Sequence, residues 1–130
     1  MRRLAREIAL QILFQSEFAP QISITSFLDV YEGSVNDESL KYAAVLIDGV
    51  QSHKEKIDSL IQASARHWKL DRMATIDRNI LRLAVYEMKF ASEILKPHMA
   101  INEAVEIAKK FSTEDSSGFI NGVLDQAGKS

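Results

Sequence analysis

Apolar residues recur at intervals of three and four along almost the whole chain. This spacing gathers apolar side chains on one face of an α-helix, whereas a half-buried strand shows a period of two. Strand-like alternation and Asn-Gly hairpin signals between alternating segments are missing. The pattern predicts helices alone, in about seven segments: 2–18, 24–32, 38–52, 54–67, 75–91, 98–111 and 115–127.

Short connections separate these segments, and internal repeats are not evident. Prolines and short polar side chains favour connections at Pro20, at 33–37, around 68–72, at Pro97 and at 112–114. We therefore expect an all-α fold in which about seven helices form two small packed bundles. The length predicts a single domain over 1–130, with helical halves of about 1–70 and 71–130.

The first predicted helix has one coherent core stripe on a helical wheel. The stripe comprises Leu4, Ala5, Ile8, Ala9 and Ile12. Arg2, Arg3 and Arg6 are expected to project from the opposite side, with Leu10 and Phe14 beside them. The helix is thus predicted to bury one face and to expose three cations.

The wheel of the segment 75–91 places two charged residues in contrasting positions. Arg82 falls opposite the apolar face, whereas Glu87 falls toward it, with Asp77 at the margin. An unpaired buried carboxylate is costly, so Glu87 is expected to have a buried partner, for example Arg66. In the segment 115–127, Phe119 is expected at the edge of the apolar face.

Composition and charge narrow the class of protein. The chain has no cysteine, which excludes disulfides, thiolate metal sites and cysteine nucleophiles, and fits a reducing compartment. Apolar runs fall short of the roughly 20 residues that cross a bilayer, so we expect a cytoplasmic protein. The net charge of −2 argues against a general nucleic-acid binder, but the first turn concentrates positive charge.

The arginine cluster has two interpretations. Cations at a helix N-terminus oppose the macrodipole, and forked guanidinium donors suit phosphate oxygens, so the cluster can form a phosphate-binding patch. Alternatively, it is a solvated and frayed terminus that happens to be basic. Phe14 and Phe119 are candidates for stacking on bases or docking a partner, although such side chains more often pack against a neighbouring helix.

Sites for catalysis, metals and cofactors are not indicated. The three histidines are scattered without metal-ligand spacing, and phosphate loops and a nucleophile elbow are absent. Glu103 and Glu106 superficially suggest a bundle carboxylate site, but a Glu-x-x-His partner segment is missing. A solvated helix face explains them. We expect neither an enzyme nor a bound cofactor.

Four segments of the chain form an ordered set: RRLARE with the following ALQ at 2–11, IDRNILRLAVYEM at 76–88, AINEAVEIAK at 100–109 and FINGVLD at 119–125. This set resembles the NusB family of bacterial transcription antitermination proteins. Together they follow the family order over nearly the whole chain. The resemblance implies an all-helical, non-catalytic protein that acts in processive transcription, chiefly of ribosomal RNA operons.

The resemblance also implies partners and site residues. Family members bind boxA RNA together with NusE, a protein of the small ribosomal subunit, and help to assemble an antitermination complex on RNA polymerase. The implied RNA contacts are Arg2, Arg3, Arg6, Asp115 and Phe119. The implied NusE contacts are Phe14 and Asp77. Charge reversal at Arg6 is expected to weaken RNA binding and to leave folding nearly unchanged.

Two departures and two alternatives accompany this interpretation. Gly118 stands where members often have a basic residue, which removes a phosphate contact, and Phe14 stands where tyrosine is common.

NusB-like domains are also fused to RNA methyltransferases, but a catalytic strand–glycine-loop–helix unit would have to follow Ser130. The other alternative is a helical scaffold that binds only protein, for instance a homodimer in which the arginine patch is buried.

Overall fold

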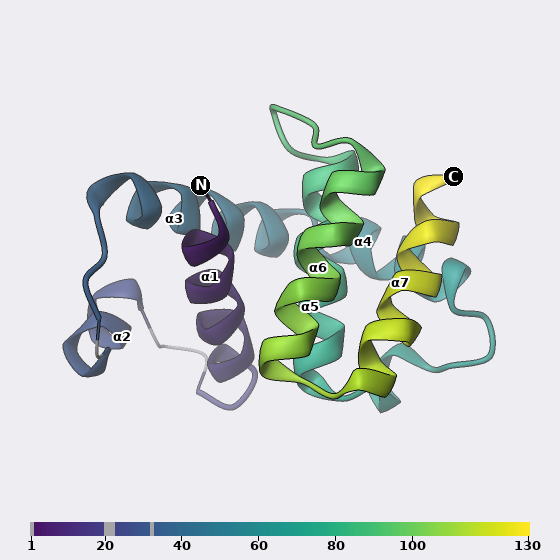
Figure 1. The fold of residues 1–130 in the computed structure, drawn as a ribbon, viewed down its shortest axis with the longest axis horizontal. Helices are drawn as coiled ribbons and strands as arrows, with labels where there is room; N and C mark the ends of the chain where they lie inside the picture. The colour runs from purple at the N-terminus through teal and green to yellow at the C-terminus, as the bar shows by residue number, and fades with distance from the viewer. Residues whose placement is uncertain (1, 20–22, 32) are drawn as a thin grey trace.

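The computed structural model describes residues 2–19, 23–31 and 33–130, and this part of the chain contains helices and no strands (Figure 1). The prediction of an all-α fold is confirmed. The helices are α1 (Arg3–Ser16), α2 (Ile24–Val30), α3 (Asp37–Ser52), α4 (Lys54–Ser64), a 3₁₀ turn η1 (Leu70–Arg72), α5 (Thr75–Lys89), α6 (Pro97–Phe111) and α7 (Glu114–Gly128).

Local sequence signals explain where several helices begin. The side chains of Ser23, Asn36 and Thr113 each accept a hydrogen bond from the backbone N–H three residues later, and so cap α2, α3 and α7. Pro97 opens α6, where its missing N–H costs nothing. The first helix has neither a side-chain cap nor an acidic residue in its first turn.

The fifth helix is the centre of the fold. It packs against α1, α3, α4, α6 and α7, and every residue from Asn79 to Met88 is buried. The prediction that Arg82 faces away from the core is wrong, because α4 and the end of α1 cover that side. Asp58 of α4 accepts two hydrogen bonds from the Arg82 guanidinium, at 2.8 and 3.0 Å.

The first helix is buried on more than one face. All residues from Ala5 to Leu10 are buried, because α1 packs against α3 and α5 while Glu103 and Lys110 of α6 contact its remaining side. The predicted core stripe is confirmed. The predicted exposed side is wrong for Arg6 and Leu10, which are 8% and 0% exposed.

Figure 1 shows α1, α2 and α3 on one side of the molecule and α4, α6 and α7 grouped around α5 on the other. The division into halves near residue 70 stays a prediction, and α4 packs against α5 and α7. Within the described residues, every helix is too short or too polar to cross a membrane.

Candidate nucleic-acid interface

The three arginines at the start of α1 lie in three different environments. Arg2 is exposed, and its guanidinium carbon lies 3.9 Å from the centre of the Tyr42 ring. The side chain of Arg3 is 41% exposed, whereas that of Arg6 is only 10% exposed. Exposure of the arginine side chains therefore decreases from Arg2 through Arg3 to Arg6 within about one helical turn.

Arg6 is held by a bidentate ion pair with Glu87 of α5. The Arg6 Nε and Nη2 atoms donate to the two carboxylate oxygens at 2.7 and 2.9 Å, and the Tyr42 hydroxyl donates to the same carboxylate at 2.5 Å. The expected buried partner of Glu87 thus exists, but it is Arg6; Arg66 is exposed beyond the end of α4. Burial and the hydrogen bond to Glu87 raise the pKa of Tyr42 to about 12.

Glu103 of α6 joins two of the arginines. It accepts from Arg3 Nε at 3.2 Å, from Arg3 Nη2 at 2.8 Å and from Arg6 Nη1 at 3.2 Å. The hydrogen bond from Arg3, with the charges of Arg3 and Arg6, lowers the pKa of Glu103 although partial burial opposes the shift. The assignment of Glu103 to a solvated face is wrong.

Two carboxylates therefore balance Arg3 and Arg6, and this balance explains how cations are tolerated at a helix start without a cap. Although burial opposes it, hydrogen bonding to Glu87 raises the pKa of Arg6. Among the ion pairs of the described residues, Arg2 takes part in none. Of the three arginines at the start of α1, Arg2 has the charge most available to an incoming phosphate.

Asp77, Asp115 and Phe119 lie around a second feature, a groove of about 380 Å³ between the start of α7 and the residues before α5. Asp115 is exposed and Phe119 is half-buried. Asp77 is buried, and its carboxylate accepts from the hydroxyls of Ser112 at 2.6 Å and Ser116 at 2.7 Å. The structure thus places Asp77, assigned to the protein partner, beside two residues assigned to RNA.

Phe14 lies at the other end of α1 from the arginines. Its half-buried ring packs edge-on against that of Phe18, with ring centres 5.3 Å apart, and Phe18 is 69% exposed. Glu17 accepts from Arg78 at 2.6 Å, so this end of α1 lies beside the start of α5 and therefore near Asp77. The aromatic pair at this end of α1 is a candidate protein-docking surface, whereas the buried Asp77 carboxylate faces Ser112 and Ser116.

Tyr42 of α3 contacts the arginine cluster and was not considered in the sequence analysis, and Glu103 of α6 was considered there but assigned to a solvated face. For Glu103 the available signal was indirect, a carboxylate on a helix remote in sequence from the cationic helix start, and for Tyr42 the sequence offered none. No group of three His, Asp or Glu side chains that could hold a metal ion occurs among residues 2–19, 23–31 and 33–130.

These features define an all-helical protein whose graded arginine cluster and aromatic groove suit a nucleic-acid ligand. The NusB family model matches residues 3–129, and the chain belongs to the NusB family. It is 64% identical over 128 residues to a transcription antitermination protein NusB from Bdellovibrio bacteriovorus, which covers 98% of this chain and 95% of that protein. A protein of the same name from Myxococcus xanthus is 43% identical over 130 residues, covering 96% and 92%.

Solved structures agree with this assignment. NusB from T. maritima superposes with a TM-score of 0.85 at 34% identity, covering 99% of this chain and 91% of that one. A crystal structure of the antitermination factors NusB and NusE in complex with double-stranded RNA matches with a TM-score of 0.81 at 32% identity, covering 98% and 96%. The family resemblance of the sequence is confirmed.

Proposed function

We propose that this protein is a non-enzymatic transcription antitermination factor. In the cytoplasm it binds boxA RNA together with NusE, joins an antitermination complex on RNA polymerase and promotes processive transcription of ribosomal RNA operons. The observation that carries the proposal is the family match over residues 3–129, supported by likeness to a NusB that is solved with NusE and RNA. The chain itself contributes a cationic helix start, which suits phosphate.

In this proposal the RNA backbone lies across the start of α1. Arg2 supplies an uncompensated charge, and Arg3 supplies the donor hydrogens that Glu103 leaves free. Arg6 uses three of its five donor hydrogens on Glu87 and Glu103, so two remain for RNA at the edge of the site. The strand continues toward Asp115 and Phe119, where a base can stack.

NusE binds, in this proposal, at the other end of α1, through Phe14 and the region of Asp77. The exposed ring of Phe18 enlarges the apolar area available there. Both carboxylate oxygens of Asp77 accept hydrogen bonds from serine hydroxyls, so in this proposal Asp77 affects NusE binding mainly by positioning Ser112 and Ser116. Bound NusE then extends the RNA surface, and the two ligands strengthen each other's binding by about 1–3 kcal/mol.

The test is fluorescence anisotropy of labelled boxA RNA and a scrambled control, with and without NusE, at two salt concentrations. We expect boxA to bind selectively, more tightly with NusE and less tightly at high salt. Arg3→Gln should weaken binding and reduce the salt dependence. Lys129→Gln is the matched control, because Lys129 also pairs with a carboxylate, Asp125, at the far end of α7. Equal affinity for both RNAs in the presence of NusE would contradict the proposal.

Glu103 gives a second and opposite test. An incoming phosphate competes with this carboxylate for Arg3, so Glu103→Gln should leave Arg3 freer and tighten RNA binding. Glu106→Gln removes the same charge from the same helix without touching either arginine, because Glu106 pairs with Lys109. The two variants should differ in affinity for boxA, and equal affinities would show that Arg3 is not an RNA contact.

A further inference from the structure

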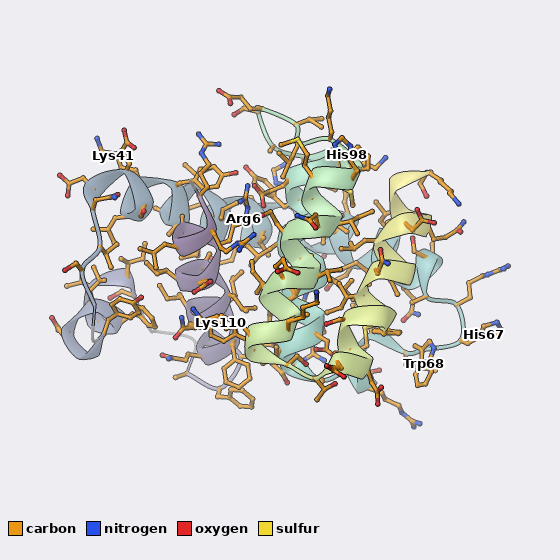
Figure 2. All side chains as sticks on the ribbon, viewed as in Figure 1. Arg6, Lys41, His67, Trp68, His98 and Lys110 are labelled. Atoms are coloured by element: carbon orange, nitrogen blue, oxygen red, sulfur yellow. The ribbon has the colours of Figure 1, made fainter. Side chains whose placement is uncertain are left out.

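The connection between α4 and α5 presents an exposed tryptophan on a fixed backbone. Trp68 is 61% exposed. The Gln62 side chain donates to the carbonyl of Trp68 at 2.7 Å and accepts from the backbone N–H of Leu70 at 2.9 Å. Arg78 donates to the carbonyl of Leu70 at 3.1 Å. The loop is therefore braced by side chains from both flanking helices while its largest side chain remains in solvent (Figure 2).

Uncompensated positive charge surrounds this tryptophan. Residues 65–72 carry Arg66, Lys69 and Arg72 against one acidic residue, Asp71, in a chain of net charge −2. All three cations are exposed, and none of them takes part in an ion pair among the described residues. An exposed aromatic side chain between free cations is the combination that proteins use to bind single-stranded nucleic acid.

The loop lies between two hollows of different character. On one side, the Trp68 ring stands edge-on to the Phe119 ring, with centres 5.7 Å apart, in the groove of about 380 Å³ described above. That groove is mainly apolar and has Arg72, Asp77 and Asp115 among its lining residues, so it suits a base, with Arg72 as the place for an adjoining phosphate. On the other side, Arg66 and His67 line a hollow of about 520 Å³ with α7, where a phosphate fits the charge.

We propose that loop 65–72 is a second contact for single-stranded RNA. One unpaired base stacks on Trp68 in the groove shared with Phe119, and the adjoining phosphates lie on Arg66, Lys69 and Arg72. The exposed carboxylate of Asp115 accepts a hydrogen bond and so favours bases with an exocyclic amino group. This inference rests on the proposed function and extends the RNA footprint beyond Phe119 onto the loop between α4 and α5.

Trp68 is the sole tryptophan of the chain, so its fluorescence reports directly on this contact. The experiment titrates the protein with boxA RNA, bare or extended by several unpaired nucleotides at either end. We expect boxA RNA to quench the tryptophan emission. The RNA that is extended at the end nearer the loop should quench it more strongly than bare boxA RNA or the RNA extended at the other end. In anisotropy measurements with NusE, Trp68→Ala should bind the more strongly quenching RNA at least about fivefold more weakly than the parent protein does. Trp68→Phe should retain most of the parent's affinity for this RNA.

The matched control is Ile94→Ala, since Ile94 is likewise 61% exposed but lies between α5 and α6. If the parent protein binds boxA selectively but Trp68→Ala binds every RNA as the parent does, this inference fails and the proposed function stands. If Trp68→Ala instead weakens binding of NusE without RNA, the loop docks protein and the inference also fails. If the parent protein with NusE ignores boxA, the proposed function itself fails.

Discussion

Arg6 is both a charged side chain and part of the core. Its guanidinium bridges α1 to α5 through Glu87 and to α6 through Glu103. Removing one partner of a buried ion pair leaves an uncompensated charge, which costs far more than losing a surface contact. Loss of RNA binding on substitution of Arg6 would therefore mix a local effect with a loss of folded protein.

We expect Arg6→Glu to destabilise the protein by about 3–5 kcal/mol, because it places a third carboxylate beside Glu87 and Glu103. This reverses the expectation from the sequence that folding would be nearly unchanged. Urea denaturation followed by circular dichroism measures the effect. Arg2→Glu makes the same charge change at an exposed position and should leave the unfolding midpoint nearly unchanged. Equal midpoints for the two variants would refute the structural role of Arg6.

The existence and order of the helices could be predicted from the sequence, because each helix depends on the local spacing of apolar residues and on caps. Which faces of these helices are buried could not be predicted. A helix packed on one side and a helix packed on several sides show the same apolar stripe, and only the neighbours decide whether Arg6, Leu10 and Arg82 are covered. Likewise, the loop that carries Trp68 begins after Ser64, three residues before the predicted end of that helix at residue 67.

Gly49 of α3 lies directly against the ring of Tyr86 of α5. A Cβ atom at this position would overlap the ring of Tyr86, which is itself only 7% exposed and has little room to move. Gly49→Ala should therefore destabilise the protein by about 1–3 kcal/mol, despite the higher helix propensity of alanine. The change in thermal midpoint measures this, and a stabilised variant would show that the two helices are less tightly packed.

Gly118 of α7 is the contrasting case, since a Cβ atom there meets nothing within 4 Å. Gly118→Ala should stabilise the protein by about 0.5–1 kcal/mol through the lower backbone entropy of the unfolded chain. Gly118→Lys should also stabilise the protein, although less strongly, and should add a phosphate contact beside Phe119. This contact should make the slope of the logarithm of the RNA-binding constant against the logarithm of the salt concentration steeper by about 0.7. If Gly118→Lys binds RNA more tightly and Gly118→Ala does not, the added charge is responsible and the gain in helix stability is not.

Ion pairs connect α1 to two helices that are remote from it in sequence, α5 and α6. Glu17 at the end of α1 contacts Arg78 and Arg82 of α5, and Glu103 of α6 contacts the start of α1. These pairs depend on the relative placement of α1, α5 and α6, which sequence spacing alone does not reveal. They also link the stability of the fold to pH.

Acid should weaken this protein through those carboxylates. Hydrogen bonds from Arg78 and Asn79 lower the pKa of Glu17 although burial opposes the shift, and Arg3 lowers that of Glu103. A carboxyl whose folded pKa is lowered stabilises the fold fully above its unfolded pKa, near 4.5, and this stabilisation is lost as the pH falls through the folded value. Unfolding free energies should therefore be steady near neutral pH and fall below about pH 4.5. Glu103→Gln, which cannot titrate, should be less stable than the parent at pH 7 but lose less on acidification, whereas parallel pH profiles for the two proteins would exclude Glu103 as a contributor.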